Sequence, residues 1–240
     1  MDNTGIEPET GYSLRLMGKD EEFAFKCARC GKCCTGIKES VALEALDIFR
    51  ISRYFKHSGC TDWMIDDFLP ECTTMIPITE FGYPMFFLNV TGPDASCVFL
   101  KSGRCGIQNA KPRTCRIYPM TMEPEWDGYG FNYYLIDDRN HRFADYAGPS
   151  VKAGQWMAEN LSAEDIAFTQ AELSAIPEIG RIMKRNLGAG VSIKTMLEWI
   201  LFFTYFNYDV ERPFMQQYQT NTEMLISILR KLNPIEMEAA

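Results

Sequence analysis

The sequence has few histidines, no excess of positive charge and no long apolar run, and each shortage excludes a class of protein. Its only two histidines, His57 and His141, lie in no spacing typical of metal ligands or of a Ser–His–Asp catalytic set. The formal net charge of −8 disfavours nucleic-acid binding, which usually needs a basic face. The longest apolar run, residues 199–206, is far shorter than the roughly 20 residues that span a membrane.

The N-terminal residues are polar and acidic, and they lack the apolar stretch of a secretory signal. Nine cysteines, an odd number, fit poorly with a framework made only of disulfides. Thiols stay reduced in the cytoplasm. We therefore expect a cytoplasmic protein whose cysteines serve a purpose other than disulfide bonding.

Cysteine is the abundant and unusually placed residue type. Four cysteines lie within eight residues, in the pattern C-x-x-C-G-x-C-C. Thiolate is a soft ligand that favours zinc, copper(I) and iron–sulfur clusters over hard cations. Gly31, at the centre of the pattern, suits a loop that closes on an ion, because glycine tolerates positive φ and close backbone approach. The pattern predicts metal ligands at Cys27, Cys30, Cys33 and Cys34.

Three later cysteines, Cys97, Cys105 and Cys115, lie beside turn-forming or basic residues and complete a set of seven candidate ligands. One tetrahedral zinc ion or one iron–sulfur cluster needs only four. Some thiols are therefore spare, or the centre is multinuclear, or there are two sites. The adjacent side chains of Cys33 and Cys34 diverge, which favours bridging two metal atoms or facing two sites. Without a metal, buried thiolates would repel one another and stay protonated.

Basic residues gather around these cysteines although the chain as a whole is acidic. They are Lys26, Arg29, Lys32, Lys101, Arg104, Lys111, Arg113 and Arg116. Such a shell can offset thiolate charge and tune a cluster; the alternative is a solvated basic patch. Arg113 and Arg116 flank Cys115, so we take them as the cofactor-binding candidates. Cys60 and Cys72 lie outside both stretches, and we expect them to be small buried residues.

The expected fold class is α+β, with a small sheet that carries the cysteine loops, followed by a helical half. We expect a metal-binding domain at residues 1–149 and a helical region at 150–240 packed on it. Residues 1–22 are expected to be irregular. Expected helices are 41–56, 62–69 (ended by Pro70), 162–176, 177–187, 192–206 and 222–232; expected strands are 75–79, 85–90 and 129–136.

The cysteine pattern resembles the CxxCxxCC cysteine-cluster family, also called the YkgJ family and described as zinc- or iron-chelating. The first part of the family motif is matched by residues 27–34. The second part is matched by Cys97, Phe99, Leu100, Cys105, Ile107, Pro112, Cys115, Arg116, Tyr118 and Pro119. Gln108 and Lys111 depart from the usual tyrosine and arginine, and Lys111 loses the bidentate geometry of arginine. The resemblance covers residues 23–122.

This resemblance implies a metal or iron–sulfur centre, because the family includes iron–sulfur oxidoreductases and flagellin lysine N-methylases carry a similar motif. The interpretation we favour is an iron–sulfur protein, for example with a [4Fe–4S] cluster, that transfers electrons to a redox partner. The alternatives are a zinc-binding structural or interaction module and an iron–sulfur-dependent protein lysine N-methyltransferase. We find no S-adenosylmethionine fingerprint in the sequence.

Overall fold

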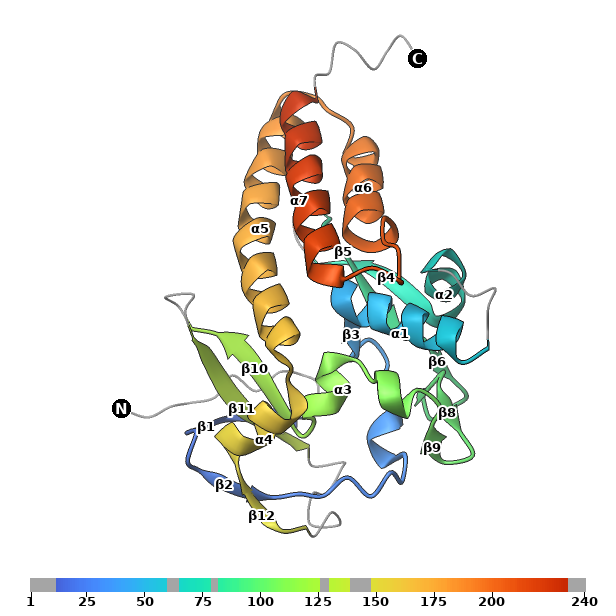
Figure 1. Cartoon of the computed structure of the whole chain (residues 1–240), viewed down its shortest axis with the longest axis vertical. Coiled ribbons are helices and arrows are strands. Elements are labelled where there is room, and N and C mark those ends of the chain that lie inside the picture. The colour runs from blue at the N-terminus through green and yellow to red at the C-terminus, as the bar shows by residue number, and fades with distance from the viewer. Residues whose placement is uncertain (1–11, 60–64, 79–81, 126–129, 139–147, 233–240) are drawn as a thin grey trace. The chain divides into compact units, whose positions relative to one another are not determined.

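Figure 1 shows the computed structural model of the chain, which describes residues 12–59, 65–78, 82–125, 130–138 and 148–232. The predicted α+β class is confirmed, since small antiparallel sheets accompany helices that dominate the C-terminal half. Contacts divide the chain into two compact units. The first unit comprises residues 1–38, 90–108 and 113–166, and the second comprises 39–89, 109–112 and 167–240. The expected division at residue 149 stays a prediction.

The first unit is built on a three-stranded antiparallel sheet of order β1-β11-β10. Its strands are β1 (Tyr12–Met17), β11 (Phe131–Asp138) and β10 (Met120–Pro124). The other elements are β2 (Glu22–Ala24) paired with β12 (Ser150–Lys152), the 3-10 turn η1 (Lys32–Cys34), the hairpins β6 (Val90–Thr91)–β7 (Ser96–Cys97) and β8 (Leu100–Lys101)–β9 (Arg104–Cys105), α3 (Arg113–Ile117) and α4 (Ala153–Asn160).

The core of the first unit forms where alternate strand residues point to one face of that sheet. Met17, Met120 and Met122 are buried there with Ile117 of α3 and Met157 of α4. An aromatic contact closes the core, because the rings of Phe25 and Trp156 meet edge to face at 5.4 Å. The short helices α3 and α4 are therefore held by side-chain packing, since helices of this length are marginal alone.

The second unit combines a small sheet with helices. Its elements are β3 (Ala42–Leu43), β5 (Pro84–Leu88) and β4 (Thr73–Pro77) in that sheet order, α1 (Ala45–His57), α2 (Ile65–Cys72), the main part of α5 (Ala163–Gly188), α6 (Ile193–Leu201), the π-helix η4 (Phe202–Phe206) and α7 (Phe214–Lys231). The short 3-10 turn η2 (Gln108–Ala110) spans the border between the two units. Figure 1 shows α5, α6 and α7 side by side, and Met183, Met196, Ile200 and Leu225 are buried between them.

Two predicted helix starts were wrong. Helix α1 begins at Ala45 and not at 41, because residues 42–43 pair with β5 as a strand. Its cap is Glu44, which forms a reciprocal capping box with Asp47, whereas Ser40 was expected. Helix α7 begins eight residues before the expected residue 222, at Phe214, which is buried against Phe168.

Two prolines expected at helix boundaries, Pro70 at the end of one helix and Pro177 at the start of another, lie inside helices. Pro70 is within α2, and Pro177 is within the 26-residue α5, which was predicted as two helices. A proline inside a helix removes one backbone hydrogen bond. The helix can still continue when buried residues before and after the proline hold both segments along one axis. Ala175 and Ile179 flank Pro177 and are both buried in one core, which explains the continuity.

Other expectations are met or revised locally. Residues 12–17, expected to be irregular, form β1, and the expected helix 192–206 ends as the π-helix η4. The glycine-rich residues 188–190 end α5, as predicted. Cys60 and His141 lie outside the described residues. In the part of the chain that the structure describes, no helix is long and apolar enough to cross a bilayer.

Candidate metal centre

The cysteine loop is shaped by left-handed backbone and by close packing. Arg29 and Gly31 have φ of 55° and 74°, and the Cys34 amide donates to the Gly31 carbonyl at 2.9 Å to form the turn of η1. A Cβ atom added to Gly31 would lie 2.7 Å from Leu100 Cδ1 and 2.8 Å from the Gly103 oxygen. Glycine is therefore required here, because the loop lies directly against the β8–β9 hairpin.

The hairpins that carry Cys97 and Cys105 are tightly defined. Ser102 and Gly103 both have positive φ, 49° and 71°, as in the type I′ turn whose twist matches that of the paired strands. After the cysteine loop, the Gly36 amide donates to the Asp94 carbonyl at 2.8 Å. This contact fixes the chain beyond Cys34 against the turn that precedes Cys97. Two stretches some 60 residues apart in sequence are thus neighbours within the first unit.

Four thiols interact with one another across these segments: Cys33, Cys34, Cys97 and Cys105. A hydrogen bond with Cys33, burial, and the charges of Cys33, Cys97 and Cys105 raise the pKa of Cys34 well above its usual range. Burial chiefly raises the pKa of Cys97, although the Phe99 amide, 3.4 Å from its sulfur, acts in the opposite direction. Both shifts favour the protonated thiols of Cys34 and Cys97 in the absence of metal, in the direction expected for buried, neighbouring thiols.

The remaining three candidate ligands are placed differently. Cys27 and Cys30 are exposed, and Cys115 is half-buried on α3. Among the described residues, no three Cys, His, Asp or Glu side chains stand close enough to hold a metal ion as they are. Binding by the four interacting thiols would therefore require their sulfur atoms to draw together. The donor set itself, all sulfur, fits zinc or an iron–sulfur cluster.

The basic residues near the cysteines divide into two groups. Lys26, Arg29, Lys32, Lys101 and Arg104 are exposed, whereas Lys111, Arg113 and Arg116 are half-buried. Arg116 forms a two-pronged ion pair with Asp165, with nitrogen–oxygen distances of 2.6 and 3.0 Å. Burial of Asp165 opposes its ionisation, but hydrogen bonds from Arg116 and Ser162 and the charge of Arg116 outweigh it and hold the pKa of Asp165 below its usual range.

Sequence analysis did not single out Asp165 as a partner of Arg116. The only signal it gave was Ser162 followed three residues later by an acid, which predicts the start of a helix. That part is confirmed: the Ser162 hydroxyl accepts from the Asp165 amide at 3.2 Å, and Asp165 accepts from the Ser162 amide at 2.8 Å. The pairing with Arg116 spans 49 residues and leaves no local pattern.

The residues outside the motif have local roles in the second unit. His57, at the end of α1, lies 3.2 Å from Glu211 Oε1, to which Lys56 also pairs at 3.1 Å. These contacts lower the pKa of Glu211, chiefly through the hydrogen bonds from Lys56 and His57. Cys72 is buried in α2 at 4% exposure, as expected for a structural residue.

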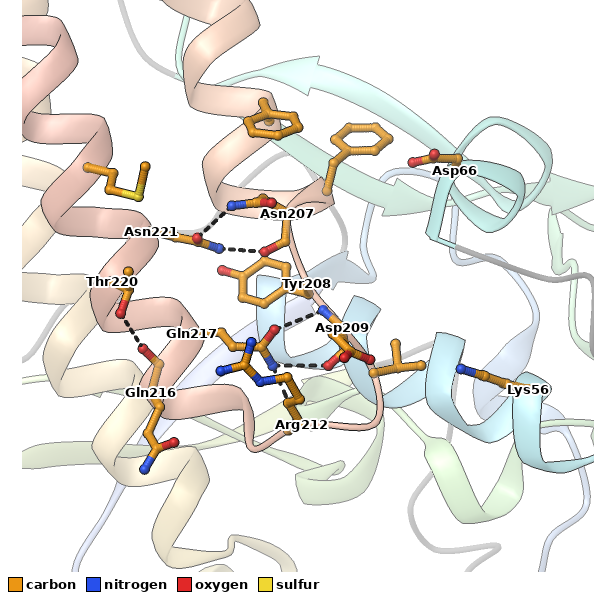
Figure 2. Close-up of a pocket in the computed structure, with 14 residues that line it drawn as sticks. Lys56, Asp66, Asn207, Tyr208, Asp209, Arg212, Gln216, Gln217, Thr220 and Asn221 are labelled. Carbon is orange, nitrogen blue, oxygen red and sulfur yellow. Dashed lines mark hydrogen bonds between the residues drawn. The ribbon is translucent and has the colours of Figure 1, made fainter.

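A pocket of about 870 Å³ lies in the second unit between the loop after η4 and helix α7 (Figure 2). Hydrogen bonds from side-chain amides fix the loop that lines the pocket. The Asn207 amide donates to Asn221 Oδ1, and the Asn221 amide donates to the Asn207 carbonyl, both at 2.8 Å. Gln217 accepts from the Asp209 amide at 2.8 Å and donates to the Asp209 carbonyl at 3.0 Å. These groups are engaged in fixing the loop, so the pocket adds no evident chemistry to the cysteine site.

Comparison with known proteins supports the cysteine site. Residues 26–142 match the CxxCxxCC family, whose description is "Putative zinc- or iron-chelating domain". The match contains all seven candidate cysteines and agrees with the resemblance drawn from the motif. No curated protein and no solved structure matches the chain. Most residues that line the pocket after η4 lie beyond the matched segment, although Lys56 and Asp66 lie within it.

Proposed function

We propose that the cysteines of residues 26–142, the segment that matches the CxxCxxCC family model, hold an iron–sulfur cluster that serves electron transfer. The packing of the cysteine loop against the β8–β9 hairpin and the hydrogen bond between Gly36 and Asp94 support this proposal, because they bring the loop of Cys33 and Cys34 next to the segments of Cys97 and Cys105. Four thiolates are the ligand number of a [4Fe–4S] or [2Fe–2S] cluster. Cys27, Cys30 and Cys115 are further ligands under this proposal, available to a larger or second centre.

When bound, such a cluster supplies one-electron chemistry, taking one electron from a donor protein and passing it to an acceptor. The chain's own residues would set the environment. Cys97, 7% exposed and covered by its hairpin, keeps water from one side of the site. The exposed side chains of Lys101 and Arg104 would present positive charge to an acidic redox partner. Reduced thiols require a reducing compartment, so we propose that the protein works in the cytoplasm.

A zinc-binding structural module is the second candidate. The observation that favours it is the number of interacting thiols, because four cysteines complete a closed tetrahedral zinc site. In that case the metal would stabilise the contact between the cysteine loop and the two hairpins. An iron–sulfur cluster contains inorganic sulfide and absorbs visible light, whereas a zinc site does neither, so chemical analysis and absorption distinguish the two candidates.

Anaerobic purification with iron, acid-labile sulfide and zinc counted per chain tests the proposal. We expect iron and sulfide in equal amounts, with visible absorption that bleaches on reduction. Zinc without sulfide or colour would replace the first candidate with the second. A chain purified without either metal, and unable to take up either on reconstitution, would contradict both candidates.

Single substitutions locate the ligands. We expect Cys33→Ser and Cys34→Ser to lose most of the bound metal, because each removes a thiol from the interacting group. Cys72→Ala is the matched control, since Cys72 is buried in α2 and lies outside the motif. Full metal content in both loop variants would show that Cys33 and Cys34 are not required ligands.

A further inference from the structure

Helix α3, which carries Cys115, has only five residues and gains its orientation from contacts at its C-terminal end. The buried side chain of Ile117 packs in the core of the first unit, and its carbonyl accepts a hydrogen bond from Trp156 Nε1 at 2.7 Å. Arg116, the residue next to Cys115, makes a further strong contact. The direction of the Cys115 side chain therefore depends in part on what Arg116 binds.

The Arg116 guanidinium is fully engaged on the turn between α4 and α5. Nη2 donates to Asp165 Oδ1 at 2.6 Å, and Nη1 donates to Asp165 Oδ2 and to the Asn160 carbonyl, each at 3.0 Å. The Asp165 side chain is 1% exposed, and that of Arg116 is 24% exposed. A planar guanidinium held on three oxygens from one side has little freedom to rotate.

Asp165 is itself held rigidly, because it closes the first turn of α5. Its Oδ2 accepts from the Ser162 hydroxyl at 2.6 Å and from the Ser162 amide at 2.8 Å. One carboxylate thus caps α5 and fixes Arg116. Any displacement of this carboxylate would be transmitted to α3 through the paired guanidinium.

We propose that Asp165 is a positioning residue that acts through Arg116 to hold Cys115 in place for the metal centre. This inference rests on the proposed function, in which Cys115 is a ligand. It gives Arg116 a role different from direct contact with a cofactor, since its donors face Asp165 and Asn160. It also extends the site beyond residue 142, where the family match ends.

The test has two readouts, one of which needs no bound metal. In the metal-free protein, iodoacetamide labelling is followed for each cysteine by peptide mass spectrometry. We expect Asp165→Asn to raise the labelling rate of Cys115 several-fold while that of Cys97 stays unchanged. In Zn²⁺ titrations against a chromophoric chelator, we expect affinity to fall about tenfold, as is typical when a supporting contact of a ligand is lost.

Asp20→Asn is the matched control, because it breaks an exposed ion pair with Lys152 in the same unit by the same chemical change. It should leave both readouts unchanged. Arg116→Lys keeps the positive charge but loses the two parallel hydrogen-bond donors of the guanidinium. Its Cys115 labelling rate and its Zn²⁺ affinity should lie between those of the native protein and those of Arg116→Met. This pair of variants distinguishes loss of positioning from loss of folding.

Native labelling of Cys115 and native Zn²⁺ affinity in folded Asp165→Asn would overturn the positioning role. A uniform rise in labelling of all cysteines would also overturn it, because that result indicates general unfolding. If the native chain took up neither zinc nor an iron–sulfur cluster, the proposed function would fail, while the labelling readout would still report on the contact between Asp165 and α3.

Discussion

Replacing Gly31 with alanine should disrupt the cysteine loop more than its backbone conformation alone explains. A left-handed conformation costs an alanine about 1–2 kcal/mol relative to glycine. The added Cβ would also lie 2.8 Å from the Gly103 carbonyl oxygen, a backbone atom that has to move. Overpacking of this kind costs about 1–3 kcal/mol more. Together these terms predict a loss of about 2–5 kcal/mol in the free energy of unfolding of the first unit.

Gly92→Ala separates the two terms. Gly92 has a φ of 70°, close to the 74° of Gly31, but nothing lies within 4 Å of an added Cβ. It should therefore show only the conformational cost. The assay is chemical denaturation of the metal-free variants, followed by metal content after reconstitution. Equal stability and equal metal content in the two variants would refute the contact between the cysteine loop and the β8–β9 hairpin.

Two further predictions concern α5. Because the pKa of Asp165 is lower in the folded protein than in the unfolded chain, Asp165 stabilises the fold fully above the unfolded value of about 4. This contribution declines as the pH falls below that value and is lost as the pH falls through the lower pKa of the folded state. Denaturation of the metal-free protein should accordingly show that the free energy of unfolding declines less between about pH 6 and pH 3 in Asp165→Asn than in the native chain. Parallel declines in the two proteins would contradict this. Pro177→Ala should raise the free energy of unfolding by about 1–2 kcal/mol in urea denaturation. The change restores a helical hydrogen bond, and this gain exceeds the loss of the proline's restriction of the unfolded chain. An unchanged free energy of unfolding would mean that α5 is adapted to the proline.

The parts of the fold that sequence reasoning predicted are those with local causes. Ser162 and Asp165 are three residues apart, so their reciprocal cap leaves a readable pattern. The turn at Ser102 and Gly103 likewise depends on the conformations of two adjacent residues. The cysteine loops were found because four thiols in eight residues have few other uses. In each case the physical cause lies within a few residues of its signal.

The parts that were missed depend on contacts distant in sequence. Pro177 was expected to begin a new helix, but burial of Ala175 and Ile179 in one core keeps α5 continuous. The pairing of Arg116 with Asp165 joins residues 49 positions apart, which no spacing rule reveals. Likewise, seven cysteines in sequence look equivalent, whereas in the structure Cys34 interacts with Cys33, Cys97 and Cys105, and Cys27 and Cys30 are exposed.

The first unit continues past the family match, to residue 166, and this matters for anyone who wishes to cut the protein into pieces. A fragment ending at residue 142 would lack β12, which pairs with β2, and α4, whose Trp156 packs on Phe25. It would also leave the Arg116 guanidinium half-buried without its carboxylate. Truncation at the end of the family match would therefore yield an incomplete core, and the shortest sensible C-terminal boundary for this unit lies beyond Asp165.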